Sequence, residues 1–479
     1  MMMRHIIEGG AVVLLSIANL GAVGSDLRLV EAVKNGDTAA MRSLVEQHVD
    51  VNARQADGAT ALAWAAYRDS LDAAELLIRA GANVNAANDY GATALWLACA
   101  KGSAAMTEKL LNAGADPNAN LLSGETPLMT AARMGSVDVM KLLLAHGANV
   151  NAKETRGAQT ALMWAVAEKH AEAARVMIEH GADIHARSKR GFTPLLFAAQ
   201  QGDVDSARIL LAAGADVNGT APGMSPLLIA TTSGHAALSV FLLEKGADPN
   251  AQDSIGLTVL YHAASRRNMQ ELVKALLPHG VNPNSRLAKN LPNPNGQGDY
   301  ALNMTGATPL LFAASVGNAD VVRLLVASGA NPLIATEENT TPLMVASGLG
   351  DFQDSAQEEE QEYWKRSHVE TAKLLVELGS DVNAVGERGW TALHGAAYMG
   401  LDDVVQLLVD KGAKMDVMDN FGQTPLSIAE GVITVGLENE NEGVARPRNI
   451  RKSTSDLLLK LGATPLAASG VQILVKKAK

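Results

Sequence analysis

The sequence predicts an all-α fold, a solenoid in which short helix pairs stack one on the next. Three observations support it. One phrase recurs at a nearly constant interval along most of the 479-residue chain, each copy holds two helix-length apolar patterns, and aromatic residues make up only 4% of the chain. A fixed period of roughly 20 to 50 residues is typical of repeat proteins, in which each unit contacts only its neighbours.

The period is marked by the triplet Gly-x-Thr. The triplet at positions 58–60 is followed by one at 91–93 and, after the same interval, by one at 124–126. Further copies centre on Thr160, Thr193, Ser225, Thr258, Thr308, Thr341, Thr391 and Thr424. These eleven copies and a degenerate opening unit that begins near residue 26 predict about twelve helix-turn-helix units.

The chemistry of one unit explains both helices. The Thr of the triplet is expected to cap the first helix, and Pro127 suits the first helical position, where a missing N–H costs nothing. The second helix has apolar residues at the spacing of Val139, Leu142 and Leu143, which predicts a buried stripe. Gly147 follows, where a left-handed backbone conformation ends the helix. A single helix pair cannot bury both of its faces, so stacking must form the core.

Phrases such as TPLMTAARMG and KLLLAHGANVNA resemble the ankyrin repeat over roughly residues 26–464. The resemblance implies β-hairpin-like loops between units, and a partner protein held along a concave surface of hairpin tips and first helices. The family usually has His after Thr-Pro-Leu, where it ties neighbouring loops together. Only His394 keeps it here, so we expect the cohesion of the other loops to depend more on packing.

The N-terminal segment, residues 1–24, is typical of a secretory signal peptide. Arg4 gives a positive start, residues 9–20 are mostly apolar, and the segment 22–24 places small residues at positions −3 and −1 of a cleavage point before Ser25. We therefore expect an exported protein of bacterial type, periplasmic or secreted, whose repeat array runs from 25 to 464 before a tail at 465–479. The alternatives are a membrane anchor that is not cleaved, or a cytoplasmic protein with a degenerate N-terminal cap.

Three insertions break the period, at about 287–304, 351–367 and 432–448. The second is expected to lengthen the second helix of the ninth Gly-x-Thr unit to roughly 23 residues, because Ser355 and Glu358 have the spacing of a capping box. One apolar stripe would then be formed by Trp364, His368, Thr371 and Leu375.

This insertion has two interpretations. It is either a solvated helix extension with Trp364 packed onto the stack, or an acidic docking site. The residues of the acidic site would be Glu358, Glu359, Glu360, Glu362, Tyr363 and Trp364.

The composition argues against several functions. A net charge of −11, from 51 acidic and 40 basic residues, argues against nucleic acid as a partner. The single cysteine, Cys99, allows no internal disulfide and aligns with core alanines of other units. The sequence has no phosphate-binding loop, metalloprotease motif or nucleophile elbow. We therefore predict a monomeric protein that is not an enzyme, with no catalytic, metal or cofactor site and no membrane span after cleavage.

Partner-binding residues are expected at the tips and at the ends of the first helices, where the resemblance places contacts. Tyr, Trp and Arg are the residues that protein interfaces favour at their most important contacts. The candidates at tips are Tyr90, Arg190, Phe192, Trp390 and Phe421. The candidates at first-helix ends are Tyr67, Arg68, Arg133, Met134, Tyr398 and Met399. The alternative is that these side chains only cover their neighbours in the stack.

Overall fold

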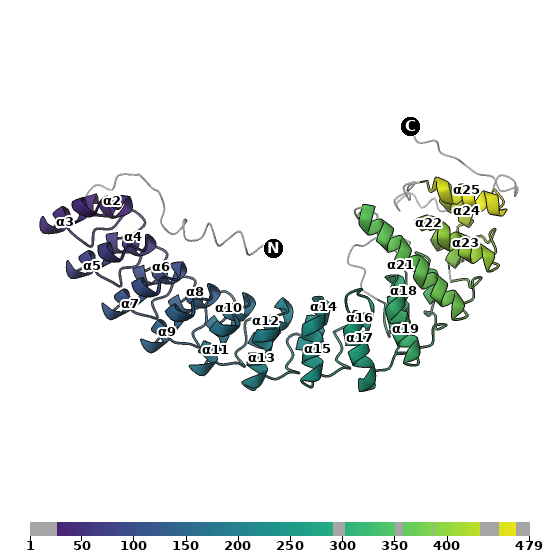
Figure 1. Ribbon diagram of the computed structural model, residues 1–479, viewed down its shortest axis with the longest axis horizontal. Coiled ribbons are helices and arrows are strands. Elements are labelled where there is room, and N and C mark those ends of the chain that lie inside the picture. Colours follow the sequence, from purple (N-terminus) through teal and green to yellow (C-terminus); the bar gives the residue numbers. More distant parts are fainter. Residues whose placement is uncertain (1–25, 291–301, 350–357, 387, 432–449, 466–479) are drawn as a thin grey trace. The chain divides into compact units, whose positions relative to one another are not determined.

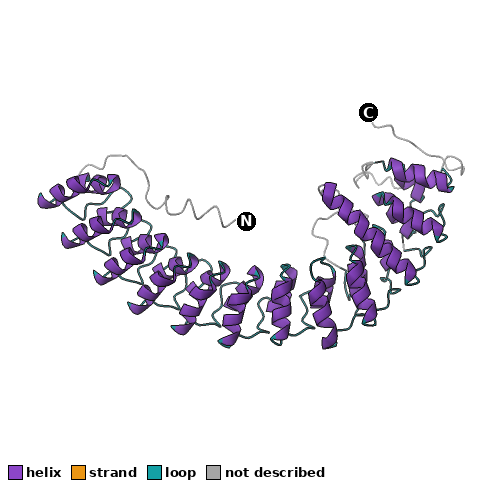
Figure 2. Ribbon diagram, viewed as in Figure 1, coloured by secondary structure: helices purple, strands orange, loops and turns teal. Residues whose placement is uncertain are grey.

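The computed structural model describes residues 26–290, 302–349, 358–386, 388–431 and 450–465, with side chains from Glu362 onward in the helix that begins at Glu358. In these residues all regular structure is helical (Figure 2), apart from three isolated β-bridges in loops. The chain divides into two compact units, residues 1–233 and 234–479. Helix labels follow Figure 1.

The first unit has two layers of helices (Figure 1), each packed in chain order. Its first-helix layer is formed by α2 (Arg28–Asn35), α4 (Ala61–Tyr67), α6 (Ala94–Lys101), α8 (Pro127–Arg133), α10 (Ala161–Ala167), α12 (Pro194–Gln201) and α14 (Pro226–Thr232). Its second-helix layer is formed by α3 (Thr38–Glu46), α5 (Leu71–Arg79), α7 (Ala104–Asn112), α9 (Val137–Ala145), α11 (Ala171–Glu179) and α13 (Val204–Ala212).

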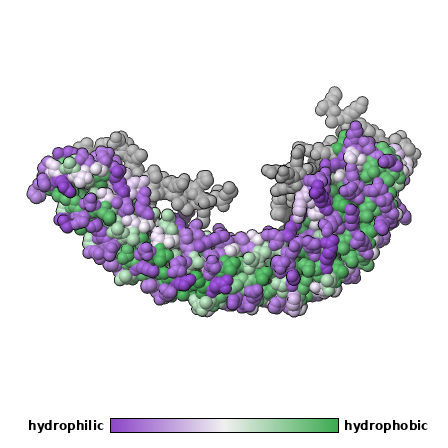
Figure 3. Space-filling view, viewed as in Figure 1, coloured by the Kyte–Doolittle hydropathy of each residue, from purple (hydrophilic) through white to green (hydrophobic). Residues whose placement is uncertain are grey.

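The second unit repeats these two layers. Its first-helix layer is formed by α16 (Val259–Ala264), α18 (Pro309–Ser315), α20 (Pro342–Ala346), α22 (Ala392–Met399) and α24 (Pro425–Ala429). Its second-helix layer is formed by α15 (Ala236–Glu244), α17 (Gln270–Leu276) with the 3-10 turn η2 (Leu277–His279), α19 (Ala319–Ala327), α21 (Glu358–Glu377), α23 (Asp402–Asp410) and α25 (Lys452–Leu461). On the face drawn in Figure 3, hydrophilic residues alternate with small hydrophobic areas. The predicted all-α repeat solenoid is confirmed.

The capping chemistry explains where the first helices begin. The Thr93 hydroxyl accepts a hydrogen bond from the backbone N–H of Trp96 at 3.2 Å, and Thr126 does the same for Met129 at 3.3 Å. Pro127 occupies the first helical turn after Thr126, as predicted. Each cap satisfies one of the N–H groups that a helix start leaves without a partner.

The core of each repeat lies between the two layers. In α9, Val139, Met140 and Leu143 are at most 1% exposed. Leu142 is only half-buried, so its expected place in the core is wrong. Successive residues of a helix point about 100° apart, which places Leu143 between Val139 and Met140 on one face and Leu142 outside that face. This helix therefore buries adjacent positions 139 and 140 together with 143, rather than 142.

Asparagine side chains link successive units at six of the turns that follow second helices. The amide of Asn118 donates to the backbone oxygen of Gly147 at 3.0 Å and accepts from the N–H of Asn149 at 2.7 Å. The same pair of bonds is made by Asn52, Asn85, Asn151, Asn284 and Asn383. Loop cohesion therefore has a polar component in addition to the packing expected from the sequence.

His394 ties two loops together as the family pattern implies. Its Nδ1 lies 3.1 Å from the backbone nitrogen of Thr391, and its Nε2 lies 3.2 Å from the backbone oxygen of Gln423 in the next loop. The imidazole is 1% exposed, and this burial lowers its pKa below the ordinary value. A neutral ring suits the arrangement, because one ring nitrogen accepts while the other donates.

Candidate protein-interaction surface

The hairpin tips depend on glycine. Gly91 has a φ of +86°, a conformation that side chains rarely adopt. A Cβ atom there would also lie 2.8 Å from the backbone oxygen of Asn120 in the next loop. The glycine of the Gly-x-Thr triplet therefore serves two purposes, since it makes the turn and lets the next loop approach closely.

Backbone hydrogen bonds join neighbouring tips in the first unit. Leu122 donates its N–H to Tyr90 at 3.0 Å, Thr155 donates to Ser123 at 2.9 Å, and Lys189 donates to Gly157 at 2.7 Å. The loops thus lie edge to edge. We refer to residues 54–57, 87–90, 120–123, 153–156 and 187–190 together as the tip row.

Two large apolar side chains are exposed at adjacent positions of the tip row. Tyr90 is 43% exposed and Leu122 is 78% exposed. A backbone hydrogen bond joins these two residues, so their side chains leave the chain at neighbouring points of the tip row. The preference of interfaces for Tyr, Trp and Arg pointed to Tyr90 and not to the aliphatic Leu122. The alignment on Gly-x-Thr would have found Leu122, which occupies the same loop two positions before Gly124.

The other tip candidates differ in exposure. Arg190 is exposed, whereas Phe192 and Phe421 are half-buried. The ring of Phe192 lies 5.6 Å from the ring of Phe197 on the same repeat. Phe192 therefore packs on α12 and also offers part of its ring to solvent.

Trp390 is not an exposed tip residue, and the expectation that it is accessible is wrong. Its side chain is 6% exposed, and its indole N–H donates to the carboxylate of Asp419 at 3.0 Å. The Arg388 guanidinium lies 5.5 Å from the centre of the ring. Trp390 takes the position between Gly and Thr, and Ala59 and Ala92 at that position are also buried.

Two candidates at the end of α4 contact neighbouring repeats. The Tyr67 ring meets the Trp64 ring edge-on at 5.7 Å, and the Lys101 ammonium lies 4.6 Å from its centre. Arg68 donates to the backbone oxygen of Lys34 at 2.8 Å and caps the end of α2. Both residues support the stack, and both retain exposed surface, with Arg68 the more exposed.

Of the two candidates at the end of α8, Arg133 contacts neighbouring side chains and Met134 is exposed. Arg133 forms an ion pair with Glu125 at 3.1 Å and lies 5.1 Å from the centre of the Trp164 ring. Met134 is 43% exposed. Met134 is therefore the more accessible of these two candidates.

Tyr398 and Met399 lie at the end of α22 and are both half-buried. The backbone oxygen of Tyr398 accepts from Arg451 at 3.3 Å. A Cβ atom added to Gly348 would lie 2.5 Å from Cγ of Met399, which shows how closely that side chain packs on the preceding repeat. The Met399 side chain thus packs against the preceding repeat and is less accessible to a partner than a fully exposed residue.

The helix extension in the ninth Gly-x-Thr unit is confirmed. Helix α21 has 20 residues, whereas its neighbours α19 and α23 have 9 each. His368, Thr371 and Leu375 are fully buried, and the half-buried Trp364 ring lies 4.1 Å from the His368 ring. The predicted stripe therefore holds α21 on the stack, and Trp364 extends it by one more turn.

The extension also contacts an earlier repeat. Tyr363 is 61% exposed, yet the Arg267 guanidinium lies 5.2 Å from the centre of its ring. Arg267 belongs to the loop between α16 and α17, and it also donates to the backbone oxygen of Val316 at 3.0 Å. Glu362 pairs with Arg366 at 3.5 Å. The side chains of Glu358, Glu359 and Glu360, and the proposed cap at Ser355, lie outside the described residues.

A groove of about 510 Å³ lies beside α21, between that helix and the start of α23. Its lining includes Lys365, Val369, Lys373, Leu401 and Asp403, with further acidic and basic side chains. Because both signs of charge are present, the groove selects no single class of charged ligand.

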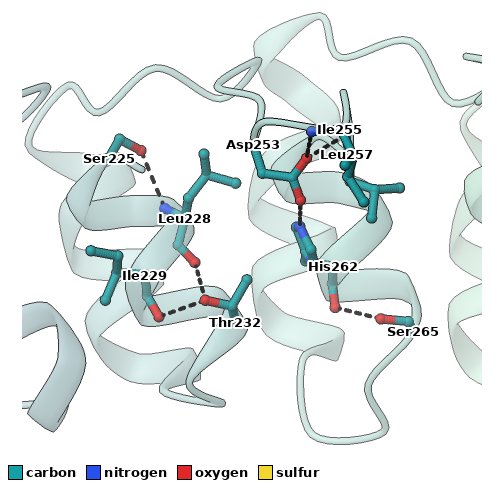
Figure 4. Close-up of polar contacts among 9 residues, drawn as sticks. All are labelled: Ser225, Leu228, Ile229, Thr232, Asp253, Ile255, Leu257, His262 and Ser265. Carbon is teal, nitrogen blue, oxygen red and sulfur yellow. Dashed lines mark hydrogen bonds and ion pairs between the residues drawn. The ribbon is translucent and has the colours of Figure 1, made fainter. Parts of the chain in front are cut away.

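A histidine–aspartate pair lies beside α16 (Figure 4). The Nε2 atom of His262 lies 2.9 Å from the carboxylate of Asp253, whose other oxygen accepts from the N–H groups of Ile255 and Leu257. Burial lowers the pKa of His262. The Ser265 hydroxyl donates to the backbone oxygen of His262 at 3.0 Å and not to its ring. The pair therefore holds a loop in place and does not activate that hydroxyl.

In the described part of the chain, no three metal-ligating side chains gather in one place. Cys99 is fully buried, and burial raises the pKa of its thiol to about 12, so it is a core residue and not a nucleophile. His146 uses its Nδ1 on the backbone oxygen of Leu142, at the end of α9. Among the described helices, none is long and apolar enough to cross a membrane.

Comparison with known proteins agrees with this repeat architecture. The chain is 32% identical over 195 residues to a rice (Oryza sativa subsp. japonica) protein named "Probable E3 ubiquitin-protein ligase XBOS34", a match that covers 33% of this chain and 35% of that protein. It is 31% identical over 236 residues to human "Ankyrin repeat and SOCS box protein 16", covering 49% of this chain and 47% of that protein. The chain thus spans about a third to a half of these curated relatives.

A solved structure, that of the human ASB11 ankyrin repeat domain, is 29% identical and covers 46% of this chain and 98% of that one, with a TM-score of 0.42. The family profile "Ankyrin repeats (3 copies)" matches residues 29–121, 106–188, 185–253, 220–287 and 363–432, and the profile "Ankyrin repeat" matches 305–337. The two profiles together match well over half of the chain. The chain therefore belongs to the ankyrin repeat family.

Proposed function

We propose that this protein is a scaffold without enzymatic activity, which binds a partner protein along the tip row and the adjoining ends of the first helices. Ankyrin repeats are protein-interaction modules, so a protein partner follows from the family. The binding surface is assigned to the tip row because of Tyr90 and Leu122, two exposed apolar side chains at hydrogen-bonded tips. Exposed apolar groups that adjoin one another are typical of interaction sites.

The proposed surface has the composition expected of an interface. Tyr90 offers a large, rigid ring, Arg190 offers a guanidinium, and Met134 offers an adaptable apolar chain. None of these three side chains is needed to fill the core, because all three are exposed. A partner can therefore cover them without disturbing the fold.

Changing Tyr90 and Leu122 to serine should reduce partner capture at least about tenfold while the melting temperature stays the same. The measurement is crosslinking pull-down from the native compartment, quantified by mass spectrometry. The matched control changes Leu71 and Leu459, which are 37% and 42% exposed on second helices, to serine. Equal loss in the control would place the partner elsewhere.

The second candidate is a regulatory role through the acidic extension of α21. The observation that favours it is the length of α21, which exceeds that of its neighbours by more than a factor of two. The same pull-down distinguishes the two functions when a Glu362→Lys variant is added. Loss of capture in this variant alone would favour the extension over the tip row as the docking site.

The names of the matched relatives do not extend this proposal. The rice protein is named as a ubiquitin ligase and the human protein for its SOCS box, but the matched segments cover 35% and 47% of those chains. A ligase or adaptor activity would need its own observation in this chain. The described residues support only the binding of a partner protein.

We further propose that the protein is exported, to the periplasm or beyond. The support is the sequence of Arg4, the apolar run at 9–20 and the small residues before Ser25. An uncleaved membrane anchor and a cytoplasmic protein are the competing possibilities.

A reporter enzyme fused after residue 30 tests the export proposal. The fusion should be recovered outside the cytoplasm, and sequencing of its N-terminus should begin at or near Ser25. The matched control replaces Val13, Leu14 and Leu15 with Asp, which should block export because the apolar run is interrupted. An untrimmed fusion in the cytoplasm would contradict the proposal, and an untrimmed membrane-bound fusion would indicate an anchor.

A further inference from the structure

Five basic side chains gather at two neighbouring tips of the first unit. Lys153 and Arg156 belong to one tip, and Arg187, Lys189 and Arg190 belong to the next. All five residues are exposed. The backbones of the two tips are joined by the hydrogen bond from Lys189 to Gly157 at 2.7 Å. We call these five residues the basic tips.

The one acidic residue in these tips does not neutralise them. Glu154 is 7% exposed, and its carboxylate accepts from the backbone N–H groups of Arg156, Gly157 and Gln159 at 2.6, 2.7 and 3.0 Å. Its charge is directed inward, to the turn that it stabilises. The basic side chains, which point to solvent, have no carboxylate of their own tips beside them.

The basic side chains have few internal partners. Lys153 and Lys189 donate to backbone oxygens of neighbouring tips, and Arg187 donates to one backbone oxygen of its own loop and one of the next. Within the described part of the chain, none of the five forms an ion pair, and the side chains of Arg156 and Arg190 make no hydrogen bond. Like charges held close together destabilise a fold, and this cluster stands out in a chain of net charge −11.

The tip row changes character along its length. Its second tip has the exposed Asp89 beside Tyr90, its third has the exposed Leu122, and its fourth and fifth are the basic tips. A uniformly anionic surface, such as a membrane or a nucleic-acid backbone, would be repelled by Asp89. An extended polypeptide can match a sequence of different sites, because each of its residues differs.

We propose that the basic tips bind an acidic, extended segment of the partner protein. The inference rests on the proposed function, since it specifies the chemistry of the partner on the same tip row. The segment places acidic residues over Arg156 and Arg190 and apolar residues over Tyr90 and Leu122. Repeats are spaced by about 10 Å, so Tyr90 and Arg190 lie about three spacings apart, and an extended chain at about 3.3 Å per residue needs roughly nine residues to reach both.

Panning a display library of random peptides, each about fourteen residues long, against the immobilised full chain tests the inference; that length exceeds the roughly nine residues needed. We expect enriched peptides to carry clustered Asp and Glu residues together with apolar residues. A fluorescein-labelled copy of one enriched peptide then gives dissociation constants by anisotropy. The Arg156→Glu/Arg190→Glu variant should bind it at least about tenfold more weakly, and added salt should weaken the wild-type complex.

The matched control is Arg42→Glu/Lys141→Glu. These two cations are exposed on second helices, have no described hydrogen bond or ion pair, and change the net charge by the same amount. The control should bind within about twofold of wild type, because the local charge and not the total charge matters. Circular dichroism should show that both variants remain folded.

Three results would overturn the inference. One is enrichment of peptides without acidic residues; if their binding depends on Tyr90 and Leu122, the proposed function stands and only the acidic partner is wrong. Another is equally weakened peptide binding in the control variant, which would mean that the total charge of the protein, and not the position of the charges, explains the effect. The third is binding to phosphatidylserine vesicles that is lost in the Arg156→Glu/Arg190→Glu variant, which would identify a lipid surface as the ligand.

Discussion

Replacing Leu143 with alanine should lower the free energy of unfolding by about 2–5 kcal/mol, because it removes a fully buried side chain and leaves a cavity. Leu143 is 0% exposed in α9, between the two helix layers of the first unit. Neighbouring repeats depend on one another for burial, so the loss should spread to the units on either side. The measurement is urea denaturation followed by circular dichroism.

The adjacent Leu142 provides the control for this prediction. It is chemically identical and lies on the same helix, but it is only half-buried. Leu142→Ala should therefore destabilise clearly less than Leu143→Ala. Equal losses would mean that the two residues are buried alike, contrary to the structure. If the array unfolds in more than one step, each transition is compared separately, because repeat arrays can lose cooperativity.

Replacing Trp390 with alanine should destabilise the second unit by about 3–5 kcal/mol, as expected for a large buried aromatic residue. The loss combines the cavity left by the indole with the hydrogen bond to Asp419, a residue that is 5% exposed. One carboxylate oxygen of Asp419 keeps the N–H groups of Phe421 and Gln423, and the other loses the indole donor, which costs further stability. Thermal unfolding should show the transition at lower temperature.

Trp390→Phe and Tyr90→Ala separate packing from interface chemistry. The Trp390→Phe variant keeps most of the ring volume but lacks the indole donor. Its loss of stability should therefore be smaller than that of Trp390→Ala. Tyr90→Ala removes a side chain that is 43% exposed and should change stability little while it weakens partner capture. A stable Trp390→Ala variant with impaired capture would restore Trp390 as a contact residue.

The comparison of Tyr90 with Trp390 shows how far the sequence predicted the candidate surface. Alignment on the Gly-x-Thr triplet located both residues in hairpin loops. It did not separate the position before Gly, which Tyr90 occupies, from the position after it, which Trp390 occupies. Ala59 and Ala92 at the second position are both 1% exposed, so small residues there indicate contact with the neighbouring repeat. Aromatic character alone could not show this.

The extended helix gives a similar result. The capping-box spacing predicted that this helix is extended, and the stripe that includes Trp364 and His368 predicted its buried face. The contact between Tyr363 and Arg267 could not be predicted, because it joins residues almost one hundred positions apart in the sequence. Sequence patterns over a few residues cannot predict a contact between residues so far apart in the chain.

The sequence by itself determined the period, the caps and the helix pairs, because these features depend on residues within a few positions of one another. Thr126 with Pro127 is sufficient to begin a helix wherever the unit lies. The tertiary structure alone decided how the repeats join. Asn118 bonds to Gly147, and Leu122 bonds to Tyr90, only when two units are stacked in one register. Exposure of a tip side chain is likewise set by the neighbouring loop, which is why burial of Trp390 and clustering of the basic tips emerged only from the assembled array.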